Sequence, residues 1–315
     1  MILLVVILLI SCNAALAWKS KESQFTRPDY VREALSRGEN LYYFGLGSNM
    51  LRSKVESRSA DGKINILSMQ AAVVHNHRLA FNMRGFVPIE PGMGSLEPLD
   101  KEGTKSRPLL AYDAPECHGA LILLDSENYN RVMMSEGVSH NATNPGYEEV
   151  VVDAYPYGSN NPVKAVALRA RPHVRLRRDP APSVRYMTML RQGAAELGLV
   201  PEYQDFLARH PVQNVPQWLR RLAINNFVFT IAVSTKLKTR ALSKLQSRLL
   251  FCLYNPRLQK GPCKLLADSA MALVLLPGSL FGCAIRFYFN KRENAEPPFL
   301  KRILSFLEES DKEKS

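Results

Sequence analysis

The sequence predicts an α+β fold, in which helices flank a small, strongly curved and barrel-like β-sheet. Two observations lead to this prediction. Short apolar runs dominate the chain up to about residue 152, and helical patterns follow them with few strand–helix–strand alternations. Of the 315 residues, 46% are hydrophobic and 22% are charged, which is typical of a globular protein with a full core. A helical C-terminal extension of basic and apolar character follows this fold.

The expected strands are short runs of high β-propensity that are bounded by turn residues. They are Leu41–Phe44, Ile64–Val74, Arg78–Asn82, Gly119–Leu124, Glu149–Val152 and Val163–Ala170. Proline and glycine are frequent from Arg84 to Pro115, so we expect no regular element there.

Three helices are expected after the first strands. In Ser126–Met134, Asp125 or the serine after it can cap the first turn. A second helix, Ser183–Leu197, begins with a capping serine and stops before Gly198. A short third helix is expected at Pro201–Ala208.

The first 40 residues indicate targeting. Residues 1–17 carry no charged side chain and end in Ala-Leu-Ala, the small-x-small pattern of a signal-peptidase site. We therefore expect a signal peptide at 1–17 and a leader or flexible arm at 18–40. Trp18 directly after the cut resembles plastid-targeting segments, so the expected route is secretory and ends in a plastid or outside the cell. An uncleaved anchor is the alternative, although about 17 residues is at the short limit for a membrane span.

Most of the positive charge lies in residues 218–315. The net charge is +12, and this part holds seventeen Lys or Arg against seven Asp or Glu. A cationic residue recurs every four positions from Lys236 to Arg248, beside an apolar row, which predicts a helix with a basic stripe. Residues 269–285 carry no charge and form either a buried helical hairpin or a membrane segment. Contact with a membrane surface is therefore open, whereas no zinc-finger, RNA-binding or helix-turn-helix pattern indicates nucleic-acid binding.

The cysteines show neither a metal-site nor a disulfide pattern. Once residues 1–17 are removed, those left are Cys117, Cys252, Cys263 and Cys283. None of them forms the short paired spacing of a zinc site or a disulfide framework, so we expect no metal.

The first candidate site element is the stretch Tyr43–Asn49, YFGLGSN. An apolar strand ends there at two glycines, which permit a sharp turn and a close approach to the backbone. Ser48 and Asn49 can bond to local backbone and hold the N–H groups of the loop outward. Such a loop can bind an anion or a developing oxyanion through its main chain, although an ordinary tight turn has the same pattern.

The second candidate is Glu136, which ends the expected helix and precedes the helix-breaking Gly137. Glutamates at helix ends are commonly solvated. Here, however, Glu136 falls between two strands expected in the same sheet as Leu41–Phe44, so its carboxylate can project over the glycine loop. A carboxylate in this place is a base that faces an oxyanion cradle. Tyr147 can either hydrogen-bond into this pocket or be an ordinary strand tyrosine.

These motifs resemble those of the γ-glutamylcyclotransferases. Tyr43–Met50 is similar to the family signature Tyr-Phe-x-Tyr-Gly-Ser-Asn-Leu. Ser135–Val138, followed by Gly146 and Tyr147, is similar to its catalytic Glu-Gly-Val stretch and the later Gly-x-Tyr. Other similar stretches are Cys117–Ala120 and Pro180–Tyr203. The likeness ends near residue 216, so a catalytic domain is expected at 41–217 and a separate extension at 218–315.

The resemblance implies a small β-barrel with flanking helices. It also implies a reaction that releases 5-oxoproline and a free amino acid or peptide from a small γ-glutamyl compound. The α-amine of the substrate attacks its own γ-carbonyl, while the catalytic residue Glu136 deprotonates that amine and protonates the leaving one. The implied substrate-binding residues are Tyr43, Phe44, Gly45, Leu46, Gly47, Ser48, Tyr147 and Tyr186. No metal or other cofactor is implied, and a homodimer is left open.

Leu46 departs from the family pattern, which usually has an aromatic residue at this position. The loop therefore lacks a hydroxyl and a ring edge, and a catalytically silent binding module on the same scaffold is one alternative. An enzyme acting on γ-glutamyl-amines of lysine side chains is a second, and a membrane-associated protein that uses its basic tail is a third.

Overall fold

The computed structural model describes residues 26–58, 63–99, 114–138, 145–176, 178–236, 250, 266–276 and 278–280. Contacts between Cα atoms divide the chain into two compact units. Of the described residues, 26–85 and 91–213 form the barrel unit, and 86–90 together with those from 214 onward form the tail unit.

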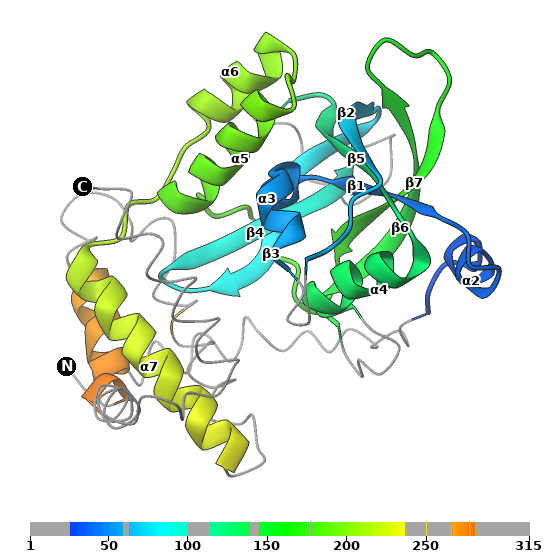
Figure 1. Ribbon diagram of the computed structural model, residues 1–315. Helices are drawn as coiled ribbons and strands as arrows, with labels where there is room; N and C mark the ends of the chain where they lie inside the picture. Colours follow the sequence, from blue (N-terminus) through cyan, green and yellow to red (C-terminus); the bar gives the residue numbers. More distant parts are fainter. Residues whose placement is uncertain are drawn as a thin grey trace. The chain divides into compact units, whose positions relative to one another are not determined.

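The barrel unit is built on a closed five-stranded barrel with the strand order β1-β5-β2-β6-β7 (Figure 1). Its strands are β1 (Leu41–Gly45), β2 (Ser68–Val74), β5 (Cys117–Leu124), β6 (Tyr147–Pro156) and β7 (Val163–Ala170). Neighbouring strands are antiparallel except at the closure, where Tyr43 of β1 pairs in parallel with Val166 of β7. The prediction of an α+β fold with a barrel-like sheet is confirmed.

Apolar side chains on both faces of β1 explain its position in the middle of two cores. Phe44 belongs to one hydrophobic cluster and Tyr43 to the other, because successive side chains of a strand point to opposite faces. The first cluster includes residues of helices α5 (Val184–Glu196) and α6 (Pro201–Arg209). The second includes residues of helix α4 (Ser126–Ser135).

The three predicted helices are confirmed, and their caps are as expected. Asp125 accepts a hydrogen bond of 2.7 Å from the Asn128 N–H at the start of α4, and this bond lowers the pKa of the Asp125 carboxyl. Ser183 Oγ accepts from the Tyr186 N–H at 3.0 Å at the start of α5. Gly198, with φ +64°, follows the end of α5.

Part of the segment expected as a flexible arm is folded against the barrel. Helix α2 (Asp29–Ser36) buries Val31 and Ala34 in the second core. Just before it, Arg27 Nε lies 2.8 Å from Glu149 Oε2 in a buried ion pair. The expectation of a loose arm is therefore wrong from residue 26 onward. The buried side chains of Val31 and Ala34 and the Arg27–Glu149 ion pair hold this polar stretch against the barrel.

A second correction concerns the proline- and glycine-rich segment. Strands β3 (His77–Phe86) and β4 (Glu90–Pro98) form a two-stranded sheet where no regular element was expected beyond Asn82. Both strands of such a sheet are edges, so a proline that cannot donate a hydrogen bond is tolerated. Residues 100–113 of the same segment lie outside the described residues.

The tail unit has its own small apolar core. Helix α7 (Gln217–Lys236) and the helical residues 266–276 contribute Leu219, Ala223, Met271 and Leu275 to it, together with Val87 and Ile89. Within the described part of the chain, no helix is both long and apolar enough to cross a bilayer. The predicted signal peptide and most of the predicted basic stripe lie outside the described residues, and the proposed domain boundaries stay predictions.

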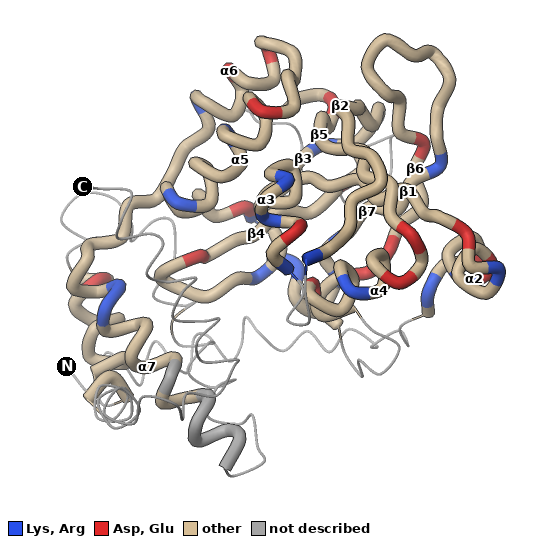
Figure 2. The backbone as a smooth tube through the Cα atoms, in the orientation of Figure 1, with Lys and Arg blue, Asp and Glu red and all other residues tan. Residues whose placement is uncertain are grey.

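Charges of both signs are interspersed over the barrel unit, as Figure 2 shows. The electrostatics of a site in this unit therefore depend on individual ion pairs at close range.

The short connection after β1 leads directly into the candidate site. A single 3-10 turn, η1 (Gly47–Met50), follows the strand, and helix α3 (Arg52–Glu56) follows the turn. Gly193 of α5 packs so closely on this turn that an added Cβ would lie 2.8 Å from the Met50 carbonyl carbon. The glycine loop is thus held between β1 and α5.

Candidate active site

The glycine loop turns sharply at Gly47, which has φ +83°. A Cβ atom added at Gly47 would lie 2.5 Å from the hydroxyl oxygen of Tyr186. Both the positive φ and this close approach require glycine at the position. The loop backbone and the Tyr186 hydroxyl therefore form one wall of the site.

Glu136 lies at the other side of this loop, directly after helix α4. Gly137, with φ +75°, ends the helix there, and the Glu136 side chain is 15% exposed. Its Oε1 accepts a hydrogen bond of 2.8 Å from Asn49 Nδ2, and the same nitrogen lies 2.7 Å from the hydroxyl oxygen of Tyr43. The structure thus brings the predicted carboxylate to the predicted loop through the buried Asn49.

Arg58 is a site residue that the sequence analysis missed. Its Nη1 lies 2.8 Å from Glu136 Oε1, and the Arg58 side chain is also 15% exposed. The guanidinium lies 3.4 Å from the hydroxyl oxygens of Ser48 and Ser135. Nothing in the local sequence singles out this arginine. It lies beside Glu136 only because the chain after α3 packs against the end of α4, and Arg58 and Ser135 are 77 positions apart.

Two tyrosine hydroxyls attach strand β4 to the site at Gly94. The Gly94 N–H donates to Tyr186 Oη at 3.0 Å, and Tyr147 Oη donates to the Gly94 carbonyl at 2.9 Å. A Cβ added at Gly94 would lie 3.0 Å from Tyr186 Oη and 3.5 Å from a methyl carbon of Leu46. Gly94 lies in the segment expected to be irregular, so the sequence analysis missed it as well.

The buried phenols at the site stay protonated. Burial raises the pKa of Tyr43 and of Tyr147, and the Glu136 charge raises both further. These hydroxyls can donate or accept hydrogen bonds but cannot serve as bases near neutral pH. The Glu136 carboxylate beside them is a group that can accept a proton.

The remaining predicted residues take two kinds of position. The side chains of Phe44 and Leu46 are buried in the first hydrophobic core, and a Cβ at Gly119 would lie 3.0 Å from the Phe44 ring. Phe44 therefore contributes packing, and only its backbone belongs to the loop. Ser48 lies beside Arg58, with 3.4 Å between Ser48 Oγ and Arg58 Nη2.

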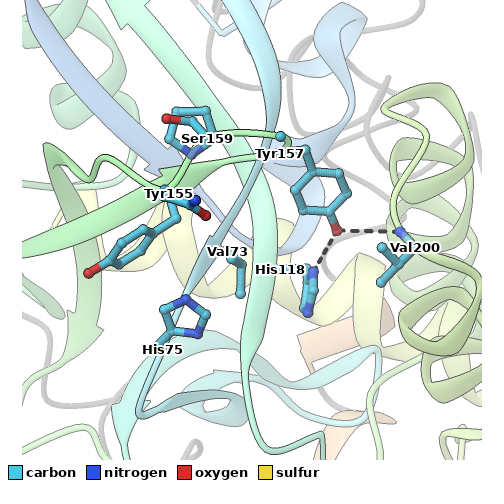
Figure 3. Close-up of a pocket in the computed structure, with 10 residues that line it drawn as sticks. Val73, His75, His118, Tyr155, Tyr157, Ser159 and Val200 are labelled. Atoms are coloured by element: carbon cyan, nitrogen blue, oxygen red, sulfur yellow. Dashed lines mark hydrogen bonds between the residues drawn. The ribbon is translucent and has the colours of Figure 1, made fainter.

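A separate cavity of about 490 Å³ lies elsewhere on the barrel unit (Figure 3). Its lining includes His75, His118, Tyr155 and Tyr157 and none of the predicted site residues. His118 Nδ1 lies 2.5 Å from Tyr157 Oη, which also accepts from the Val200 N–H at 3.3 Å. Burial lowers the pKa of His118, and its ring belongs to a polar network in the wall of the cavity.

No group of three or more His, Cys, Asp or Glu in the part of the chain that the structure describes is placed to hold a metal ion. Cys117 is a buried free thiol, and burial raises its pKa to about 12. Such a thiol is a poor nucleophile and a poor metal ligand.

The fold and the site define an α+β barrel protein that holds a carboxylate over a glycine loop. No family model matches the chain. The chain is 31% identical over 169 residues to the gamma-glutamyl cyclotransferase gliK of Claviceps purpurea, a match that spans 53% of this chain and 70% of that protein. It is 27% identical over 184 residues to gliK of Aspergillus fumigatus, spanning 56% of this chain and 64% of that protein. The chain belongs to the gamma-glutamyl cyclotransferase family, as its motifs predicted.

A solved structure named gamma-glutamyl cyclotransferase covers 56% of this chain and 91% of its own, at 18% identity and a TM-score of 0.44. This likeness is too distant to add to the assignment.

Proposed function

We propose that this protein is a γ-glutamylcyclotransferase that releases 5-oxoproline and a free amino acid or peptide from a γ-glutamyl compound. The proposal rests mainly on one observation. Asn49, which follows the glycine loop directly, donates a hydrogen bond of 2.8 Å from its Nδ2 to Glu136 Oε1 and so joins the loop to the carboxylate. The carboxylate is partly buried, and the glycines of the loop beside it are closely packed, with Tyr186 Oη 2.5 Å from an added Cβ at Gly47. Membership of the family supports the same reaction.

The proposed reaction needs proton transfer but no external nucleophile. The α-nitrogen of the substrate forms a bond to its γ-carbonyl carbon, and the bond from that carbon to the leaving nitrogen breaks. One proton moves from the attacking nitrogen to the leaving nitrogen, and a further proton of the α-ammonium is released to solvent or to the leaving amine. Because the nucleophile is tethered in a five-membered ring closure, proximity supplies a large part of the rate.

Glu136 is the proposed proton shuttle. Asn49 Nδ2 and Arg58 Nη1 each lie 2.8 Å from its Oε1. These two contacts fix the orientation of the carboxylate beside the loop. A carboxylate held in this way can accept the proton from the attacking amine and return it to the leaving one.

The loop from Gly45 to Ser48 is the proposed binding element for the reacting end of the substrate. Its N–H groups can stabilise negative charge through preorganised hydrogen bonds. Tyr147 and Tyr186 hold β4 beside the loop through Gly94. Leu46 has no hydroxyl, so the proposed mechanism uses the backbone at this position and not the side chain.

The test is to assay the purified protein for 5-oxoproline with γ-glutamyl-alanine, glutathione and ε-(γ-glutamyl)-lysine. We expect 5-oxoproline from at least one donor, and release that is at least about 100-fold slower from folded Glu136→Gln. Absence of product from all three donors, with a protein that unfolds cooperatively, would favour the silent binding module. Product from the lysine compound alone would identify the lysine-directed enzyme.

We propose membrane-surface contact as a second property of the tail unit. Leu266, Leu273 and Leu280 recur every seven residues and are 72%, 52% and 66% exposed. Within the helical residues 266–276, Leu266 and Leu273 share one helix face, and residues 218–315 are strongly basic. An exposed apolar row within a basic sequence favours an anionic lipid surface. The secretory or plastid destination stays a prediction.

A further inference from the structure

We propose that Arg58 and Glu136 together recognise the α-amino acid head of the substrate, with Arg58 binding the α-carboxylate and Glu136 the α-ammonium. This inference rests on the proposed function and names the part of the substrate that the site requires. It assigns a substrate contact to an arginine that no motif indicated.

The geometry of the ion pair supports this assignment. Arg58 Nη1 and Glu136 Oε1 lie 2.8 Å apart, and each side chain keeps 15% of its surface exposed. The pair therefore reaches the surface beside the loop, where a substrate can approach both groups. An α-amino acid carries a cationic and an anionic group on the same carbon, which is the complementary arrangement to a neighbouring carboxylate and guanidinium.

The chemistry of arginine fits a carboxylate ligand. A guanidinium presents several N–H donors in a planar fork that matches the two oxygens of a carboxylate. In the free protein, Arg58 is also within 3.4 Å of the Ser48 and Ser135 hydroxyl oxygens. These two longer contacts hold the guanidinium between the glycine loop and the end of α4, which are the two elements of the site.

Asn49 allows the guanidinium to change partners without loss of the catalytic geometry. Its Nδ2 holds Glu136 Oε1 independently of Arg58, and the Asn49 side chain is buried and anchored to Tyr43. When the substrate binds, each member of the protein ion pair exchanges its partner for the opposite charge on the substrate. The carboxylate of Glu136 then stays in position beside the amine that it deprotonates.

This assignment also gives Arg58 and the loop amides different parts of the substrate to bind. The sequence left open whether the loop amides hold a carboxylate of the substrate or the oxyanion. If Arg58 binds the α-carboxylate, the N–H groups from Gly45 to Ser48 remain for the γ-carbonyl oxygen, where negative charge develops in the transition state. The enzyme then requires a free α-carboxylate as well as a free α-amine.

The test is a two-by-two cycle of protein and substrate. Wild type and Arg58→Gln are each assayed for alanine release from γ-glutamyl-alanine and from 4-aminobutyryl-alanine, which lacks only the α-carboxylate and closes to 2-pyrrolidinone. We expect Arg58→Gln to lower kcat/KM for γ-glutamyl-alanine by about 10- to 150-fold, as for a lost charged hydrogen bond, mainly through KM. For 4-aminobutyryl-alanine the change should stay below about 3-fold.

The matched controls separate recognition from folding. Arg52→Gln removes an exposed arginine of α3 that pairs with Glu56 at 3.2 Å and should leave both substrates unaffected. Arg58→Lys keeps the charge without the fork and should recover part of the loss; it replaces Arg58→Gln if that variant does not fold. Calorimetric binding of 5-oxoproline and 2-pyrrolidinone gives the same comparison where turnover is too slow to measure.

The outcomes distinguish the inference from the proposed function. An equal loss for both substrates would show that Arg58 only positions Glu136, and this would overturn the inference while the cyclotransferase activity stands. A wild-type protein that folds but releases no 5-oxoproline would instead overturn the proposed function. If Arg58→Gln binds 5-oxoproline more weakly than wild type but binds 2-pyrrolidinone equally well, the result supports the inference.

Discussion

At the scale of single residues, Asn49 and Gly47 determine whether the site can form. Asn49 holds Glu136 in place through a 2.8 Å hydrogen bond. Gly47 lets the loop pass the Tyr186 hydroxyl at a distance that no other residue permits. Neither residue carries out chemistry in our account, yet both set the geometry on which proton transfer depends.

Substitution of Gly47 tests the close approach of the loop. Gly47→Ala places a Cβ 2.5 Å from Tyr186 Oη, whereas Gly38, with φ +67°, has no atom within 4 Å of an added Cβ. Both alanines should cost about 1–2 kcal/mol in unfolding free energy from the positive φ alone. Gly47→Ala alone should also lower kcat/KM, by about 100-fold, because Tyr186 must move to make room for the added Cβ. Equal activities of the two variants would contradict the assigned role of this wall.

At the scale of elements, hydrogen bonds from side chains join parts that strand pairing does not. Strand β4 is attached to the site by Tyr147 and Tyr186 at Gly94. Elsewhere, β5 is tied to the start of α6 through His118, Tyr157 and the Val200 N–H. These contacts place loops and helix ends around the barrel, and they respond to protonation where a histidine takes part.

The tie between β5 and α6 should make stability depend on pH. Burial lowers the pKa of His118, so as the pH falls below the unfolded value of about 6.5 the unfolded chain binds a proton that the folded chain does not. The unfolding free energy should therefore fall below this pH, by at most about 1.4 kcal/mol per pH unit for one group. Urea denaturation from pH 5 to 8 measures this loss.

The matched variants for this measurement are His118→Gln and His77→Gln. His118→Gln should flatten the fall in stability below pH 6.5, about the ordinary histidine value, whereas His77→Gln, at the start of β3, should keep the wild-type slope. Identical slopes in all three proteins would show that His118 does not titrate with folding.

At the scale of the whole molecule, the chain combines a barrel unit with a tail unit of different chemistry. The barrel unit carries interspersed charges (Figure 2), whereas most of the net positive charge lies in residues 218–315. The proposed catalysis uses the barrel unit, and the proposed membrane contact uses the tail unit.

Vesicle binding tests the proposed role of the tail unit. The full chain should sediment with vesicles that contain anionic lipid, and 0.5 M salt should weaken this binding by screening. Replacement of Leu266, Leu273 and Leu280 by Gln should reduce the binding by about 10-fold or more, because each buried leucine contributes about 1.5–3 kcal/mol. Met134→Gln, at a 65% exposed position of α4, is the control. Equal binding to neutral vesicles would exclude the electrostatic part of the proposal.

Local patterns predicted the regular part of the fold and part of the site. The strand before Gly45 and the helices α4 and α5 follow from apolar runs, caps and breakers. Strand β4 did not, because its prolines and glycines indicate a loop and are tolerated only on an edge. Helix α2 did not, because a buried Arg27–Glu149 pair joins residues 122 positions apart.

The site shows the same division. The proximity of Glu136 to the loop could be predicted because helix-end and glycine signals are local. Arg58 and Gly94 were missed because their places arise only when β1, β4, α4 and α5 meet. Contacts between residues far apart in the sequence leave no local pattern, so they cannot be predicted from a single sequence.

The central claim is that the Glu136 carboxylate transfers the proton during ring closure. The most direct measurement is kcat for 5-oxoproline release by Glu136→Gln, compared with Glu127→Gln in the first turn of the preceding helix α4. The Glu127 side chain is 72% exposed and pairs with Arg131. We expect kcat to fall by about 10²- to 10⁴-fold in Glu136→Gln and to stay within about 2-fold in Glu127→Gln. A folded Glu136→Gln that retains the wild-type kcat would contradict the account.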